Sequence, residues 1–280
     1  MKKITIIIGV LILTFTSFHF LLKEIDTYRV SSGLSEGSVY DALLPSEFVG
    51  TVALGGFRAA AVNFFWVRAM DAWEKKIWYE ALTLYRLISK LQPRLANIWI
   101  INAWNMIYNI SVDFNHKEQQ ELSWEWIKEG VDFLKEGINR NPKSPELHFY
   151  LGWVYYDKGK NSIYREYFLK RGEHPVKEAC YYIGKAAEFA PSTYYFYNYW
   201  YSFMLRERAL IEESEGNISE AFTLINDSIT ALRLAEKSIP KHPDFQQFED
   251  GIKMRLKELD ERKVLLEKMC GSSMQADKRG

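Results

Sequence analysis

Side chains that could perform catalysis are scattered along this chain of 280 residues. A helical zinc site needs two histidines four residues apart, and none of the five histidines has a partner at that spacing. His174 precedes Cys180 by six residues, which is the best candidate for a nucleophile with its base. The adjacent carboxylates Glu212 and Glu213 lie in a charged stretch typical of a solvated helix face. We therefore expect no catalytic residue, metal or cofactor, and a protein that is not an enzyme.

Composition argues against nucleotide and nucleic-acid binding. The pair Gly55 and Gly56 lacks the preceding strand and the Lys-Ser/Thr sequence of a phosphate loop. The 36 basic and 36 acidic side chains cancel, so the chain lacks the positive charge that binds a nucleic-acid backbone. Cys180 and Cys270 are too few for a disulfide framework or a metal cluster, and we expect both to stay unpaired.

Four prolines recur at a fixed interval and indicate an internal repeat. Pro93, Pro142, Pro191 and Pro240 are each 49 residues apart. Three positions upstream of each proline, spaced four and three residues apart, follow a mostly small, large, small pattern on one helix face. These positions hold Ala81, Gly130, Ala179 and Ser228, then Tyr85, Leu134, Ile183 and Leu232, then Ile88, Gly137, Ala186 and Ala235. One helical unit is therefore used four times, as in stacked repeats that bind other molecules.

These units resemble tetratricopeptide repeats (TPRs), in which two antiparallel helices carry fixed large, small and proline positions. The third unit matches best, because His148, Leu151, Gly152 and Tyr155 reproduce Leu-Gly-x-x-Tyr after a histidine that replaces tryptophan. The resemblance implies an all-α fold, a TPR-like α-solenoid of antiparallel helix pairs over residues 48–243. The stretch from LGGFRAAAVNFFWVRA to KLQPRLANIWIINAWNMIYNISV is also similar to membrane-anchored bacterial TPR proteins, which implies no reaction.

Two features depart from the TPR pattern. The fourth unit matches least, because it places Tyr197, Tyr201 and Met204 where Trp, Gly and Tyr are expected. Three units also carry 15 extra residues between their two helices, since the family's repeat has 34 residues and the interval here is 49. The extra residues form either longer helices or projecting loops. They either contact a partner on one face or deepen the core.

The resemblance also implies a binding surface, because the concave face of a TPR solenoid is lined by its first helices. Transferring those positions selects mainly aromatic residues, with amides and one arginine close by. Aromatic anchors beside adaptable amides are typical of interface hot spots, although large aromatic rings also fill the seams between helices. The candidates are Trp66, Trp73, Asn97, Trp104, Tyr108, Phe149, Trp153, Tyr156, Tyr195, Asn198 and Arg206, with Asn63 and Asn102 nearby.

The amino terminus predicts a membrane anchor. Residues 4–22 carry no charge and are mostly Ile, Leu, Val and Phe, which is long enough to cross a hydrocarbon layer about 30 Å thick. A cleaved secretory signal is the alternative, but the apolar run is longer than usual and no cleavage site is evident. Lys2 and Lys3 precede the run, so the positive-inside rule keeps the amino terminus in the cytoplasm. We expect a single-pass inner-membrane protein whose repeat domain lies outside the cytoplasm, on the periplasmic side.

The remaining segments complete the domain organisation. We expect a membrane anchor over residues 1–25, a linker rich in Ser and Gly over 26–47, and a helix from Phe57 to Trp73. Residues 244–269 form a charged helix with one apolar side, which we expect to cap the last repeat. Glu249 with Lys253 and Glu258 with Arg262 are favourable pairs on that helix. Residues 270–280 are expected to form a disordered tail.

Together these features favour a membrane-anchored scaffold or adaptor that binds a protein or peptide partner. Assembly or stabilisation of an envelope or membrane complex is the expected setting, either as a permanent subunit or as a transient adaptor. The alternative is a module that uses its aromatic face to bind a glycan, lipid or peptide ligand.

Overall fold

The computed structural model describes residues 23–24, 27, 58–114, 118–191 and 194–277, the last seven of these by their backbone alone. In the part of the chain that the structure describes, every regular element is a helix, which confirms the all-α prediction. The chain divides into two units, residues 1–64 and 65–280, and the described helices lie in the second unit apart from the beginning of the helix Arg58–Glu74. The predicted anchor and linker, residues 1–47, lie outside the described residues apart from Lys23, Glu24 and Thr27.

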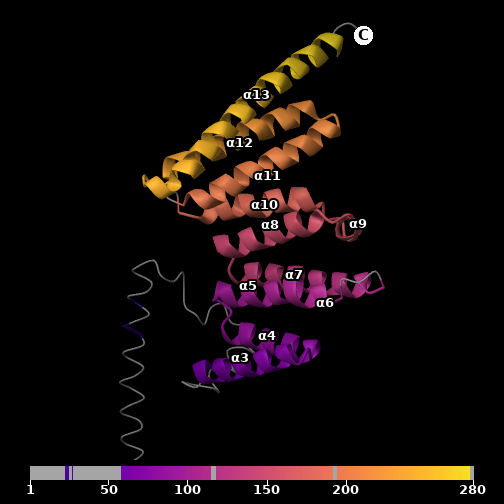
Figure 1. The fold of residues 1–280 in the computed structure, drawn as a ribbon, viewed down its shortest axis with the longest axis vertical. Helices are drawn as coiled ribbons and strands as arrows, with labels where there is room; N and C mark the ends of the chain where they lie inside the picture. The colour runs from indigo at the N-terminus through magenta and orange to yellow at the C-terminus, as the bar shows by residue number, and fades with distance from the viewer. Residues whose placement is uncertain (1–22, 25–26, 28–57, 115–117, 192–193, 278–280) are drawn as a thin grey trace, which may run out of the picture. The chain divides into compact units, whose positions relative to one another are not determined.

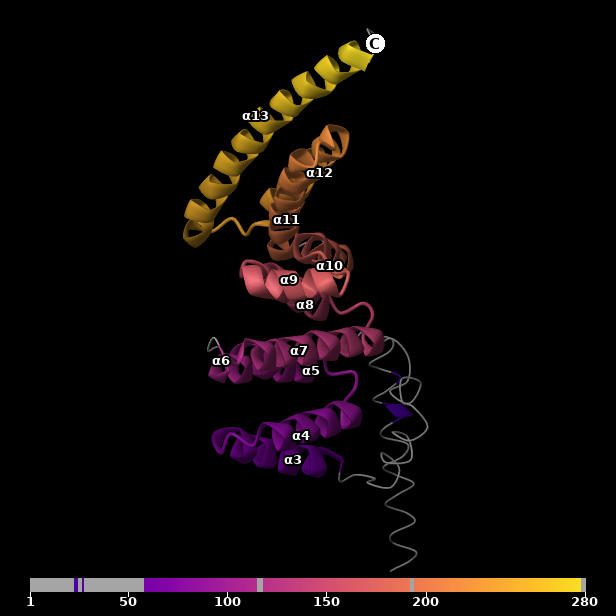
Figure 2. The same ribbon diagram turned by 90° about the vertical axis from the view of Figure 1, so that its right-hand side faces the viewer.

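The helices form successive pairs (Figures 1 and 2). The first pair is α3 (Arg58–Glu74) with α4 (Trp78–Leu91). The second is α5 (Ala96–Trp104), continued by the π-helix η3 (Asn105–Ile110) and α6 (Ser111–Asp113), with α7 (Gln120–Arg140). The third is α8 (Pro145–Gly159) with α10 (Pro175–Phe189), separated by α9 (Ser162–Lys170). The fourth is α11 (Tyr195–Ser214) with α12 (Ile218–Ser238).

The four prolines mark the ends of the second helices, as predicted. Helices α4, α7, α10 and α12 end at Leu91, Arg140, Phe189 and Ser238, each two residues before its proline. Proline cannot donate a backbone hydrogen bond and disfavours a helical residue before it, so the helix stops there. Pro93 has a further role, because its carbonyl accepts hydrogen bonds from the Trp99 indole at 3.0 Å and the Asn141 amide at 2.7 Å.

Small residues let the two helices of the second, third and fourth pairs approach closely. A Cβ atom added to Gly130 would lie 3.2 Å from the Ala103 carbonyl oxygen, and one added to Gly152 would lie 3.0 Å from that of Ala179. In the fourth pair the Ser228 hydroxyl donates to the Ser202 carbonyl at 2.8 Å. These contacts hold the repeated small position of each second helix at the crossing point, where no larger side chain fits.

The 15 extra residues take two forms. In the second and fourth pairs they lengthen both helices, so that α7 and α12 each have 21 residues. In the third pair they form the separate helix α9, and α10 has only 15 residues. The reason lies in Gly172, whose φ of 76° is left-handed, and Pro175, which occupies the first turn of α10. The alternative of longer helices therefore holds for the second and fourth pairs, whereas the third insert forms a separate helix instead of a projecting loop.

Helix α9 contributes to the core. Phe168 is fully buried, with its ring centroid 4.8 Å from that of Trp124 on α7 and 5.0 Å from that of Tyr155 on α8. The Tyr164 hydroxyl lies 2.9 Å from the hydroxyl of Ser123, also on α7. Apolar burial and a buried hydrogen bond therefore hold α9 against α7 of the preceding pair.

The fourth pair is shifted by one residue relative to the sequence prediction. The buried positions of α8 recur in α11 after 50 residues, so Gly152 corresponds to Ser202 and Tyr155 to Leu205. The second helices keep the interval of 49, as Ala179 and Ser228 show. The assignment of Tyr201 to the small position was therefore wrong. Ser202 takes it, because only a small side chain fits opposite Ser228.

The carboxyl-terminal helix α13 (Gln246–Asp277), preceded by the short helix η4 (Pro243–Phe245), packs along α12. Its buried residues Ile252, Leu259 and Leu266 are seven apart, which is the spacing of a coiled-coil seam. The helix continues to Asp277 instead of ending at Met269. Lys253 and Glu249 pair at 2.8 Å as expected, whereas Arg262 pairs with Glu213 on α11 instead of Glu258.

Among the described residues, no helix has the length and apolarity needed to cross a membrane. The apolar run at residues 4–22 lies outside the described residues.

Gly152→Ala and Gly251→Ala should change stability in opposite directions. The new Cβ at position 152 would lie 2.7 Å from Ile183 Cγ1, and the overpacking should reduce the free energy of unfolding by about 1–3 kcal/mol. Gly251 is exposed within α13 with no atom within 4 Å of its added Cβ, so alanine should gain about 0.5–1 kcal/mol. Chemical denaturation of both variants measures the difference. Equal effects would contradict the close crossing at Gly152.

Candidate functional site

The predicted aromatic residues of the second and third pairs come together on one face of the first helices. Trp104 and Tyr108 have ring centroids 4.2 Å apart, and Trp104 reaches Tyr150 of α8 at 6.2 Å. Phe149, Trp153 and Tyr156 continue the row along α8, with ring centroids 6.5 Å and 6.0 Å apart. Each of these rings keeps part of its surface exposed, and Trp104 is 40% exposed. They are therefore accessible to a partner.

Helix α11 extends this row with residues that the sequence prediction missed. The Trp200 ring lies 5.1 Å from Trp153, and the Phe203 ring lies 5.4 Å from Tyr156. The one-residue shift of α11 explains the omission, because Phe203 and not Ser202 corresponds to Trp153. We use the name aromatic face for eight partly exposed rings from α5, η3, α8 and α11, namely Trp104, Tyr108, Phe149, Tyr150, Trp153, Tyr156, Trp200 and Phe203.

Cations lie over the rings of the aromatic face. Lys158 Nζ is 4.2 Å from the Tyr108 ring centroid, and Lys160 Nζ is 4.1 Å from that of Tyr156. Arg255 of α13 lies over Phe203 at 5.6 Å. Burial lowers the pKa of Lys158, and the neighbouring Asp157 partly opposes that effect. Such cation–π contacts leave one side of the charge free for an anionic or polar group.

The remaining sequence candidates do not join the aromatic face. Trp66 contacts Tyr85 of α4, with ring centroids 6.3 Å apart. Tyr195 packs against Phe248 of α13 at 5.4 Å, and Arg206 pairs with its neighbour Glu207. Trp73 is 39% exposed and Asn97 is also exposed, whereas Asn102 is fully buried and its amide has no hydrogen-bond partner. Asn198 lies in a cleft on another side of α11.

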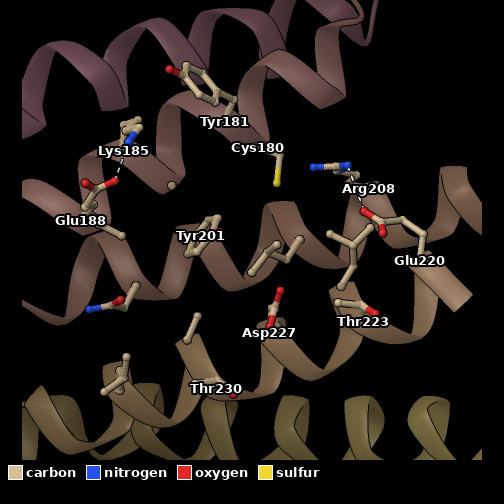
Figure 3. Close-up of a pocket in the computed structure, with 17 residues that line it drawn as sticks. Cys180, Tyr181, Lys185, Glu188, Tyr201, Arg208, Glu220, Thr223, Asp227 and Thr230 are labelled. Carbon is tan, nitrogen blue, oxygen red and sulfur yellow. Dashed lines mark hydrogen bonds and ion pairs between the residues drawn. The ribbon is translucent and has the colours of Figure 1, made fainter.

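That cleft lies between the second helices α10 and α12, with α11 as its floor (Figure 3). Its volume is about 690 Å³. Lys185 pairs with Glu188 at one end, and Arg208 pairs with Glu220 at the other. Asp227 lies between them, and Cys180 and Tyr201 point into the same space. Sequence reasoning did not find this cleft, because its residues come from three helices with no common motif.

The Cys180 thiol in the cleft is not activated as a nucleophile. Burial raises the pKa of the Cys180 thiol to about 11, although Arg208 opposes this, so the thiol is protonated at neutral pH. His174 stands before α10, where burial and Lys177 lower its pKa. The His174 and Cys180 pair considered from the sequence therefore supplies no thiolate. Among the described residues, no group of three His, Cys, Asp or Glu side chains could hold a metal ion.

The corresponding groove between α7 and α10 is filled by a polar cluster. Lys135 pairs with Glu173 at 2.8 Å, and Arg171 pairs with Asp132 at 2.7 Å. Burial raises the pKa of Glu178, Lys135 opposes the rise, and Glu173 adds to it. The ionised form of Glu178 is therefore destabilised in the folded protein at neutral pH.

Comparisons with known proteins assign the chain to no family. No protein-family model matches the chain, and no curated protein matches its sequence. A crystal structure of MamA protein aligns with 76% of this chain and 96% of that one, at 11% identity and a TM-score of 0.34. That similarity is too low to support an argument. The assignment as a TPR-like helical fold therefore depends on the helix pairs, their small-residue crossings and their terminal prolines.

Glu178→Gln should stabilise the protein at neutral pH. The folded state holds the Glu178 proton more tightly than the unfolded state, whose ordinary pKa is 4.5, so the wild type loses stability as pH rises above that value. The gain from glutamine should be largest near pH 7 and should vanish below about pH 4.5. Thermal unfolding across this range measures it. Glu188→Gln on the same helix is the control, because Glu188 is ion-paired and should give no gain.

Proposed function

We propose that this protein is a membrane-anchored TPR-like scaffold that binds a protein or peptide partner on its aromatic face. The proposed setting is the assembly or stabilisation of an envelope or membrane complex, with the repeat domain on the periplasmic side of the inner membrane. The protein acts by binding and not as an enzyme.

The aromatic face is the observation that carries this proposal. Its rings span three helix pairs and remain only partly buried, whereas the core positions at the helix crossings are completely closed. Clusters of Trp and Tyr with neighbouring cations are characteristic of the residues that contribute most to protein binding. The rings already contact one another, so they lose little conformational freedom when a partner binds.

Two further features support a scaffold. The inserts lengthen the helices of the second and fourth pairs, which enlarges the surface available to a partner. Helix α13 covers the last pair through Ile252, Leu259 and Leu266, as a capping helix does in a solenoid. The uncharged run at residues 4–22 supports the membrane anchor.

The alternative is a module that binds a glycan, lipid or peptide ligand by stacking. The exposed Trp104, with the Tyr108 ring inclined at 32° beside it, favours this reading because a planar ligand could extend the pair. Tryptophan fluorescence of the purified protein would change on adding such a ligand alone, without a second protein.

The double variant Trp104→Ala with Trp153→Ala should lose its partner in cross-linking and affinity purification from native membranes. Hot-spot truncations commonly cost 2 kcal/mol or more each, so recovery of the partner should fall by about tenfold or more. Circular dichroism should stay helical, because both side chains are partly exposed.

Tyr79→Ala is the matched control, since Tyr79 is an exposed aromatic residue outside the aromatic face. Its recovery of partner should equal that of the wild type. Unchanged recovery with the double tryptophan variant, or equal losses in both, would refute the assignment of the aromatic face.

The full chain should remain with the membrane fraction after alkaline carbonate extraction, because a spanning helix is not released by charge or pH. A variant that begins at residue 26 should be recovered in the soluble fraction. Release of the full chain by carbonate, or a mature protein that lacks residues 1–25, would replace the anchor with a peripheral or cleaved form.

A further inference from the structure

The cleft of α10, α11 and α12 has a filled counterpart one repeat earlier. Second helices correspond at an interval of 49 residues, and α8 corresponds to α11 at 50. The counterpart groove therefore lies between α7 and α10, over α8. Comparing the two grooves position by position shows which groups the open cleft lacks.

In the filled groove, Tyr155 and Tyr182 form a parallel stack, with ring centroids 6.0 Å apart and planes inclined by 5°. Lys135 Nζ lies 5.7 Å from the Tyr155 ring centroid. Glu178 and Glu173 provide the negative charge that faces these groups, since Lys135 lowers the pKa of Glu178 and both carboxylates raise that of Tyr182. The groove is thus closed by these rings, by the cations Lys135 and Arg171, and by carboxylates.

In the open cleft, the corresponding positions lose one cation and both rings but keep the carboxylate. Ala231 stands where Tyr182 would be, Leu205 replaces Tyr155, and Gly184 replaces Lys135. Asp227 corresponds to Glu178. The Tyr201 ring lies against Gly184, where an added Cβ would be 2.8 Å from Tyr201 Cε2, so this ring forms part of the floor.

The charges of the cleft leave Asp227 uncompensated. Lys185 pairs with Glu188 at 2.7 Å, and Arg208 pairs with Glu220 at 3.2 Å. Among the described residues lining the cleft, Asp227 is the charged side chain without an ion pair. Its negative charge contributes to raising the pKa of both Cys180 and Tyr201, although burial is the larger cause for each, so it faces the interior of the cleft.

We infer that this cleft binds a segment of a protein partner that presents an aromatic ring next to a lysine or arginine. The ring takes the space of Tyr182 beside Tyr201, and the cation lies opposite Asp227. This inference rests on the proposed scaffold function and adds a second contact on another side of α11. A protein segment fits better than a small molecule, because Tyr181 and Leu234 on the rim are 58% and 49% exposed and leave the cleft open.

The test uses the full chain in detergent micelles and three short peptides: acetyl-Tyr-Lys-amide, acetyl-Tyr-Glu-amide and acetyl-Leu-Lys-amide. Binding is followed by methyl NMR of the alanine and leucine side chains that line the cleft. The Tyr-Lys peptide should shift Ala231 and Leu205 and bind about 2–5-fold more tightly than the Tyr-Glu peptide, as expected for one accessible ion pair. Added salt should reduce this difference. The Leu-Lys peptide should bind more weakly than the Tyr-Lys peptide.

Two variants separate the contributions. Asp227→Asn should reduce the preference for Tyr-Lys over Tyr-Glu towards one, without changing the fold, because Asp227 is exposed. Ala231→Tyr rebuilds the ring of the filled groove and should abolish the shifts. Equal binding of the three peptides, shifts away from the cleft, or no loss of preference in Asp227→Asn would overturn the inference, even if Ala231→Tyr fails to fold.

The Trp104→Ala and Trp153→Ala double variant distinguishes this inference from the proposed function. It should bind the Tyr-Lys peptide like the wild type, because neither residue lines the cleft. If this variant binds the Tyr-Lys peptide selectively and still recovers the partner, the assignment of the aromatic face is wrong and that of the cleft stands. If this variant loses the partner but binds the three peptides without preference, the inference about the cleft is wrong and the assignment of the aromatic face stands.

Discussion

The close approach of two helix backbones in each pair is the constraint on which the rest of the fold depends. At Gly130 and Gly152 an added Cβ would come within 3.2 Å of a carbonyl oxygen on the facing helix. This approach fixes the rotation of the first helix, because only its small residue can point to the crossing. Large residues on the same side, such as Trp99 and Tyr155, are then buried at fixed positions. The residue that directly follows each small residue of the first helices points away from the crossing and stays partly exposed. Trp104, Trp153 and Phe203 are these residues, and they therefore share one face.

In the fourth pair, polar side chains form the crossing and still allow the two helix backbones to approach closely. Ser202 and Ser228 are fully buried, and burying two hydroxyls without partners would be unfavourable. Their oxygens lie 2.9 Å apart, and Ser228 also donates to the Ser202 carbonyl, so both polar groups are satisfied. The crossing therefore tolerates serine in place of glycine and alanine. The shift of α11 by one residue follows from this pairing, and the shift brings Trp200 and Phe203 into contact with α8.

The sequence was sufficient for features set by local chemistry. The prolines predicted where the second helices end, because a proline such as Pro93 stops the helix that precedes it. The recurring small residues predicted buried positions such as Ala81. The sequence alone did not determine features that depend on how two helices pack against each other. Tyr201 and Ser202 are both plausible in the first helix, and only the position of Ser228 across the pair decides between them. Gly172 and Pro175 were visible breaks within one insert, and they could have predicted that α10 begins late and leaves α9 separate. Asn198 was misplaced because of the same one-residue shift.

The filled and open grooves follow from how each unit uses its extra residues and its small positions. In the third pair, α9 and the turn after it carry Phe168 and Glu173 towards α7 and α8, and the polar cluster closes the groove. In the fourth pair the same extra length continues α11 and α12, so no separate segment closes the cleft that Ala231 and Gly184 line. The extra residues of the third pair thus contribute to internal packing, whereas those of the fourth pair remain at the surface. Since Trp200 and Tyr201 are adjacent on α11 but point to different sides, a partner contacting both surfaces must reach around this helix. A long or two-part binding segment meets that requirement better than a single compact ligand does.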